Sequence, residues 1–192
     1  MPEQADDRRT KRTRKAVLDA FFVLLQQQRY AQIRVADVIA RADVGRSTFY
    51  DHFKNKDDLL LHSMSWIYAI LADVVVEDAD TAKLAGLLDH FWGNRKLARE
   101  LMSGPAAALG PKHGIRHLTA LIETRLAVIC REQKRTPVVP LPLAAAQITE
   151  GMMSLIKAWL LGAASSKPAI LAKVVHESAR GSMAAFLGPA SK

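Results

Sequence analysis

Apolar residues recur along this chain at the spacing of α-helices, while the two-residue alternation of β-strands is nearly absent. The first such segment carries a continuous apolar stripe made of Val17, Ala20, Phe21, Leu24 and Leu25. This stripe predicts an amphipathic helix that ends near Gln28. Further helices are predicted near residues 81–92, 95–109, 114–134, 142–163 and 168–187, with Gly, Pro and Ser at the breaks between them. The predicted fold class is therefore all-α.

Two short helices joined by a tight turn are predicted between residues 35 and 53. Apolar residues mark the buried face of each, namely Val35, Val38, Ile39 and Ala42 in the first and Phe49 and Phe53 in the second. The break between them falls at Asp43-Val44-Gly45, and the outer face of the second helix is polar. This is the layout of a helix-turn-helix, in which the second helix enters the major groove of DNA.

A longer helix is predicted to follow, with Asn55 as its N-cap and an end near Val76. Asp58 places a negative charge in its first turn, where the helix dipole favours one. We expect a helix-turn-helix domain over residues 10–56, and this longer helix to lead from it into a larger helical domain over residues 57–192.

The charge of the chain favours a polyanionic partner. Its 192 residues have a formal net charge of +8, and the pI is near 9.8. Six of the eight residues from Arg8 to Lys15 are Lys or Arg. Beside a DNA-reading motif these cations can contact phosphates, although residues 1–9 equally fit a disordered, solvated basic arm.

Other features exclude several classes of protein. Cys130 is the single cysteine, which excludes a disulfide-stapled domain. The polar N-terminus lacks a signal-peptide core, and no uncharged apolar run reaches the roughly 18 residues of a membrane span, so we expect a cytoplasmic protein. His113 and His117 have a metal-binding spacing, but no third ligand is placed near them. We find no catalytic motif and expect neither an enzyme nor a metal or cofactor.

The helix-turn-helix segment resembles the signature of the TetR family of bacterial transcriptional regulators. The matching positions are Ile33, Val35, Ile39-Ala40, Val44, Thr48-Phe49-Tyr50, His52-Phe53, Lys56 and Leu59-Leu60. Three positions depart from it. Arg34 stands where the family often has a capping Thr, Asp43 replaces a turn glycine, and Gly45 replaces a Ser N-cap. Asp tolerates a left-handed backbone and Gly is an acceptable cap, so we expect the motif to survive.

The resemblance and the side-chain chemistry assign DNA contacts to the same residues, which are Arg34, Arg46, Ser47, Thr48, Tyr50, His52 and Lys56. Arg46 and Ser47 lie at the end of the recognition helix that points into the groove, where Arg46 can bridge guanine O6 and N7. The hydroxyls of Thr48 and Tyr50 can reach a base edge or a phosphate. The remaining three, Arg34, His52 and Lys56, are expected to position the helix against the DNA backbone.

The resemblance also implies a small-molecule site in the C-terminal domain and a homodimer. Large apolar side chains could line the site or merely fill a core, and these are Trp66, Trp92, Met102, Met152 and Trp159. A pocket lined in this way suits a small lipophilic ligand. The last two helices, about 142–163 and 168–187, carry small residues that would allow close pairing with a symmetry mate, unless they only complete the core of the monomer.

The sequence thus predicts a sequence-specific DNA-binding transcriptional regulator. The family resemblance favours a repressor that a small-molecule inducer releases from a near-palindromic operator. The alternative is a nonspecific, nucleoid-type DNA-binding protein without a ligand, which would bind in a salt-sensitive manner without sequence preference.

Overall fold

The computed structural model describes residues 2–103, 110–163 and 165–188, and it contains no β-strand in those ranges. The prediction of an all-α fold is confirmed. The first helices are α1 (Pro2–Gln27), the 3₁₀ helix η1 (Tyr30–Gln32), α2 (Val35–Ala42), α3 (Arg46–His52) and α4 (Lys56–Ser63). The rest are α5 (Ser65–Ala72), the 3₁₀ helix η2 (Asp73–Val75), α6 (Thr81–Gly93), α7 (Arg95–Ser103), α8 (Gly110–Glu132), α9 (Leu141–Leu161) and α10 (Pro168–Leu187).

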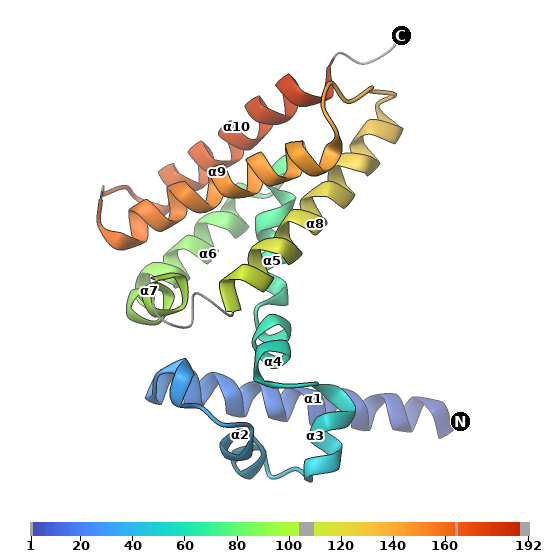
Figure 1. Cartoon of the computed structure of the whole chain (residues 1–192), viewed down its shortest axis with the longest axis vertical. Coiled ribbons are helices and arrows are strands. Elements are labelled where there is room, and N and C mark those ends of the chain that lie inside the picture. The colour runs from blue at the N-terminus through green and yellow to red at the C-terminus, as the bar shows by residue number, and fades with distance from the viewer. Residues whose placement is uncertain (1, 104–109, 164, 189–192) are drawn as a thin grey trace.

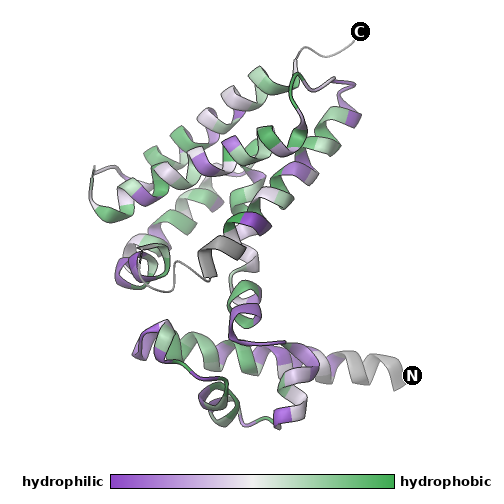
Figure 2. Ribbon diagram, in the orientation of Figure 1, coloured by the Kyte–Doolittle hydropathy of each residue, from purple (hydrophilic) through white to green (hydrophobic). Residues whose placement is uncertain are grey.

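The helices form two units, which Figure 1 shows one above the other. In the N-terminal unit, α1 lies across α2 and α3. In the C-terminal bundle, α5 to α10 pack together, and α4 leads from one unit to the other. Figure 2 shows that the helices carry both apolar and polar faces, as amphipathic helices must in a small bundle. Each unit has its own cluster of buried apolar side chains.

The N-terminal unit is built on the predicted stripe of α1. Val17 and Phe21 are fully buried there and pack in one cluster with Val38 of α2 and Phe49 of α3. The helix α1 begins at Pro2 and takes in residues 2–9, for which the sequence left a disordered arm open. Proline is suited to the first position of a helix, and neither Gly nor Pro interrupts residues 3–27.

The long helix predicted after Asn55 is interrupted at Met64, and α4 and α5 are bent by 48° relative to each other. Two serine hydroxyls flank the break. Ser63 Oγ donates to the carbonyl of Leu60 at 2.7 Å, and Ser65 Oγ donates to that of His62 at 3.0 Å. Such bonds compete with the amides that would continue the helix, which explains why the prediction of one helix to Val76 was wrong.

The C-terminal bundle follows the predicted helices closely, since α6, α7, α8, α9 and α10 coincide with the five predicted segments within a few residues. Residues 104–109, which we predicted to end α7, lie outside the described residues. Among the residues described, no single helix is long and apolar enough to cross a membrane, although the bent pair of α4 with α5 and η2 meets that test by length and composition.

Candidate nucleic-acid interface

The turn between α2 and α3 requires one left-handed residue, and Asp43 supplies it with φ 51° and ψ 50°. Asp adopts this conformation more readily than most residues, so the motif keeps its geometry without the glycine. Gly45 precedes α3 with φ −68°, an extended conformation open to any residue. The glycine is thus not needed for the backbone conformation. Its one effect is that no side chain caps the first amides of α3.

Arg34 starts α2 in an unexpected way. Its backbone amide donates to Asp37 Oδ2 at 2.9 Å, and its guanidinium lies 3.1 Å from Asp37 Oδ1. The hydrogen bond from the guanidinium is the main reason that the pKa of Asp37 is lowered. The carboxylate of Asp37 thus satisfies the backbone amide of the N-cap residue, whereas no side chain at the N-cap position takes the place of the missing Thr. The Arg34 side chain is 80% exposed, so it remains available to a phosphate.

The recognition helix α3 separates a buried face from an exposed one. Phe49 and Phe53 are buried, and their ring centroids lie 5.7 Å apart. Arg46, Ser47 and Tyr50 are exposed, and the Arg46 guanidinium lies over the Tyr50 ring at 5.9 Å. These three side chains present a cation, hydroxyl groups and an aromatic ring on one surface, which is the chemistry that reads base edges.

Two other predicted contacts on α3 are less accessible. Thr48 and His52 are each half-buried. The His52 ring lies 6.3 Å from the ring of Phe53, at the end of the helix. Their position suits contacts to the DNA backbone at the margin of the interface rather than to base edges in its centre.

Lys56 is used inside the protein. Its Nζ donates to the carbonyls of Tyr30 at 2.9 Å and Ile33 at 3.0 Å, and it lies 4.3 Å from the centre of the Tyr30 ring. Burial lowers the pKa of this lysine. The geometry therefore favours a role in joining α4 to the connection between α1 and α2, instead of the phosphate contact predicted from the sequence.

Tyr30 is a structural residue that the sequence analysis missed. It is 1% exposed, and its hydroxyl donates to a carboxylate oxygen of Asp57. Burial, followed by the contact with Asp57, raises the pKa of Tyr30. Tyr30 and Lys56 thus form two crossing links between η1 and α4. The only signal in the sequence was an aromatic residue just after the first helix, and this spacing has no unique meaning.

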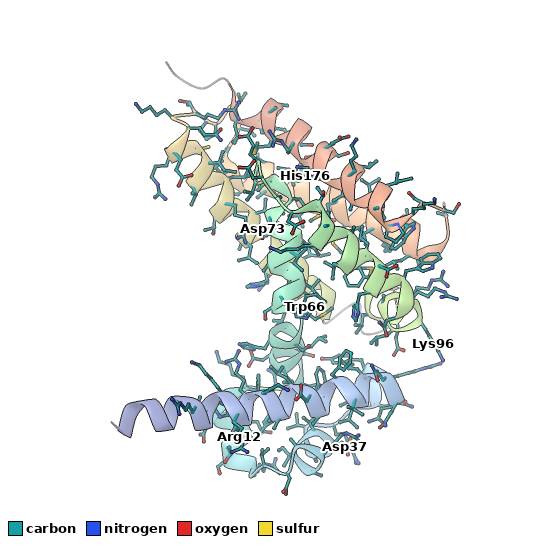
Figure 3. The ribbon with its side chains drawn as sticks, turned by 180° about the vertical axis from the view of Figure 1, so that it is seen from behind. Arg12, Asp37, Trp66, Asp73, Lys96 and His176 are labelled. Atoms are coloured by element: carbon teal, nitrogen blue, oxygen red, sulfur yellow. The ribbon has the colours of Figure 1, made fainter. Side chains whose placement is uncertain are left out.

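The basic segment of α1 borders the N-terminal unit. Lys11, Arg12 and Lys15 are exposed, while the Arg14 guanidinium lies 5.5 Å from the centre of the Phe53 ring. Figure 3 shows Arg12 on α1, on the side of the molecule that also carries α2 and Asp37. Cations along α1 therefore extend the positive surface beyond α3.

An apolar cavity of about 60 Å³ lies in the C-terminal bundle, next to the break between α4 and α5. Its lining residues come from six helices and from the break at Met64, and they are Leu60, Met64, Ile67, Tyr68, Leu71, Phe91, Leu101, Met102, Ile115, Leu118 and Met153. Tyr68 carries the only hydroxyl among them and is 8% exposed. That hydroxyl donates to Met64 Sδ at 3.7 Å, a weak acceptor, and burial raises the pKa of Tyr68 to about 12.

Of the five residues predicted to line a pocket, only Met102 lines this cavity. Trp66 is 48% exposed and meets the ring of His90 edge-on. Trp92 stacks on Trp159, whose Nε1 donates to the carbonyl of Ser166 at 2.9 Å. Met152 is buried in the bundle core. Its neighbour Met153 faces the cavity instead, because adjacent residues of a helix point about 100° apart.

Small side chains leave a groove along α9 and α10. Gly151, Leu155, Ser178 and Ser182 are among the residues that line it, and Leu155 is exposed. A Cβ atom added at Gly181 would have no neighbour within 4 Å. Close approach of another helix is therefore sterically allowed on this face.

No group of three or more metal-ligating side chains occurs among the residues that the structure describes. His117 lies edge-on against the Tyr68 ring, with ring centroids 5.6 Å apart. The side chain of His113 lies outside the described residues.

Residues 17–62 match the family described as bacterial regulatory proteins, tetR family. An uncharacterized HTH-type transcriptional regulator from Bacillus subtilis, YxbF, is 46% identical over 59 residues, which are 30% of this chain and 16% of YxbF. The HTH-type transcriptional activator of the dhaKLM operon from Lactococcus lactis, DhaS, is 36% identical over 69 residues, which are 35% of each protein. The matches thus span far less than two thirds of either relative.

The solved structures extend the likeness over the whole fold. The crystal structure of a TetR transcriptional regulator from Streptococcus agalactiae resembles this chain with a TM-score of 0.56 and 26% identity. The match covers 92% of this chain and 98% of that one. These relatives are described as transcriptional regulators.

Proposed function

We propose that this protein controls transcription by binding a near-palindromic operator as a homodimer. The premise is that residues 17–62 form a TetR-family domain and that the chain has the fold of TetR-family regulators. The observation that carries the proposal is the exposed surface of Arg46, Ser47 and Tyr50 on α3, held in place by buried Phe49 and Phe53. Two such helices in a dimer would enter successive major grooves, about 34–36 Å apart.

The contacts divide by position. We assign base reading to Arg46, Ser47 and Tyr50, with Arg46 on a guanine as the strongest term, about 1–3 kcal/mol of discrimination. Arg34, together with the half-buried Thr48 and His52, suits the DNA backbone. In this scheme Lys56 acts indirectly, by fixing α4 against the rest of the N-terminal unit.

The dimer is proposed to form through the grooved face of α9 and α10. Apolar side chains that are exposed in the single chain lie along these helices, including Leu155 at 37%, Ile170 at 55% and Val174 at 42%. Pairing would bury them in a four-helix arrangement whose small residues permit close contact.

The ligand proposed for the apolar cavity is a small lipophilic molecule with one oxygen acceptor. Apolar side chains would surround its body, and the Tyr68 hydroxyl would exchange the weak Met64 sulfur for the ligand oxygen. The cavity holds about 60 Å³, whereas sites for drug-sized ligands hold about 300–1,000 Å³. Ligand entry therefore requires the lining helices to separate.

This separation would reach the DNA-binding unit directly. Leu60 and Leu101 line the cavity and also belong to the apolar cluster of the N-terminal unit, and Met64 packs against both clusters. A ligand that displaced α4 or α7 would shift that unit and change the spacing of the recognition helices. Only a difference in ligand affinity between the two spacings could drive release from DNA.

The test is selection of random-sequence duplexes by the purified protein at near-physiological salt. An enriched palindrome, lost in Arg46→Ala, would support a sequence-specific dimer and supply the operator. Salt-dependent binding without enrichment would favour the nucleoid-type alternative. We propose repression with ligand-induced release, and a ligand that tightened operator binding would contradict that sign of control. DhaS, which this chain resembles over 69 residues, is named as an activator, so the sign of control is tested separately from DNA binding.

A further inference from the structure

A second, polar cleft of about 950 Å³ opens between the two units of the fold. One wall is the end of α1 and the following turn, from Leu25 to Arg29 with Gln32, and the other is the junction of α6 and α7. Figure 3 shows Lys96 on the α7 side of this space, facing the C-terminal end of α1. The cleft shares no lining residue with the apolar cavity.

The charges of the cleft are strongly unbalanced. Its lining includes four cations, Arg29, Arg95, Lys96 and Arg99, and one carboxylate, Glu100. Among the described residues, neither Arg29 nor Lys96 has an ion-pair partner. Four cations gathered around a single carboxylate repel one another, so an anion bound among them lowers the free energy.

The other two cations are already oriented by their neighbours. The Arg95 guanidinium lies over the Trp92 ring at 5.6 Å. The Nε of Arg99, which is also among the residues that line the cleft, donates to the carbonyl of Leu160. Held guanidinium groups suit phosphate oxygens, because their planar fork donates two parallel hydrogen bonds and loses little entropy on binding.

We propose that this cleft binds a small phosphorylated molecule, and that the anion bridges Arg29 of the N-terminal unit and Lys96 of α7. The amide side chains on the lining, including those of Gln32 and Asn94, would hydrogen-bond the uncharged part of the ligand. Operator DNA is a poor candidate, because Figure 1 shows α7 on the opposite side of α1 from α2 and α3.

The site offers a second way to control DNA binding, and this part rests on the proposed function. Each wall belongs to a different unit, so a bridging anion favours one orientation of the N-terminal unit over others. The resulting change in operator affinity would be independent of the apolar ligand, and the two effects would combine as coupled equilibria.

The test titrates inorganic pyrophosphate into the full-length protein by calorimetry, with ionic strength held constant by NaCl. We expect saturable binding that weakens roughly tenfold in Lys96→Gln and in Arg29→Gln, since each loses a charge-assisted hydrogen bond. Glu100→Gln should bind more tightly, because it removes the carboxylate from the cleft. Arg131→Gln removes an exposed cation from the far end of α8 and should leave binding unchanged.

Each contrary result overturns a defined part of the proposal. Absence of saturation, or equal weakening in Arg131→Gln, would reduce the effect to general attraction of anions by a basic protein. Operator binding is then measured with and without pyrophosphate. Loss of operator affinity in Lys96→Gln without pyrophosphate would show that the cleft contacts DNA. If pyrophosphate leaves the operator affinity of the wild-type protein unchanged, the proposed control of DNA binding by the anion is refuted. The calorimetry does not depend on the operator, so failure of the proposed function would be recognised separately.

Discussion

Replacement of Lys56 by methionine separates a structural lysine from a DNA-contacting one. Methionine keeps most of the side-chain volume and removes the ammonium, which donates to two backbone carbonyls and lies 4.3 Å from the centre of the Tyr30 ring. Hydrogen bonds to charged groups contribute about 1.5–3 kcal/mol each, and half-buried ones fall at the lower end. Part of that gain is offset by the desolvation that lowers the pKa of Lys56.

We therefore expect Lys56→Met to lower the free energy of unfolding by about 2 kcal/mol, with a fall in Tm of about 4–8 °C. Urea unfolding followed by circular dichroism measures this change. The matched control is Lys54→Met, which alters an exposed neighbouring lysine and should stay within about 0.5 kcal/mol of the wild type.

The same variants are then compared in operator binding at a low temperature, where both remain folded. A structural lysine leaves the salt dependence of binding unchanged. A phosphate contact would reduce the slope of log K against log salt by about 0.9 per subunit, or about 2 in the dimer. Wild-type stability together with a reduced slope would refute the structural reasoning and restore the contact predicted from the sequence.

Three further outcomes follow from the described contacts. Gly181→Leu should yield a monomer by light scattering, whereas Gly86→Leu should keep the wild-type oligomeric state. At both helical sites an added Cβ atom would have no neighbour within 4 Å, but Gly181 lies on α10, next to the groove-lining Ser182, and Gly86 lies on α6. Gly114→Ala should lower the free energy of unfolding in urea by about 1–3 kcal/mol, because the added Cβ atom would overlap the Tyr68 hydroxyl. Combining it with Tyr68→Phe should relieve part of this loss. Burial raises the pKa of Tyr68 to about 12 in the folded state, so the unfolded chain loses the Tyr68 proton first as the pH rises. The contribution of Tyr68 to the free energy of unfolding should therefore decline by about 1.4 kcal/mol per pH unit between pH 10 and 12, and Tyr68→Phe should show a shallower decline.

The helix-turn-helix could be predicted because its determinants are local. Phe49 and Phe53 are four residues apart, so their burial on one face follows from helix geometry alone. The cap at Asn55 was equally readable, and its side chain accepts from the amide of Asp58 at 2.8 Å as predicted. Asp43 takes the left-handed conformation that its residue type allows.

The cavity could not be predicted because its lining depends on packing between distant segments. Helix α9 is apolar over much of its surface, so periodicity could not decide whether Met152 or Met153 faces a cavity. Trp159 looked suited to a ligand, but the later residue Ser166 supplies a hydrogen-bond acceptor and Trp92 a stacking partner. The two partners of Lys56 were hidden for the same reason, since Tyr30 and Ile33 are more than 20 residues earlier in the chain.

The domain boundary predicted at residue 56 is not a boundary in the packing of the apolar side chains. The apolar cluster around α1, α2 and α3 also takes in Leu59 and Leu60 from α4 and Leu101 from α7. Leu101 is 8% exposed in that cluster, and the next residue, Met102, lines the apolar cavity. A displacement of α7 by a ligand would therefore change the packing of the N-terminal unit without passing through the bend at Met64. Close-packed interiors transmit such shifts because they have few voids to absorb them, so α7 provides a second mechanical route between ligand and DNA beside α4.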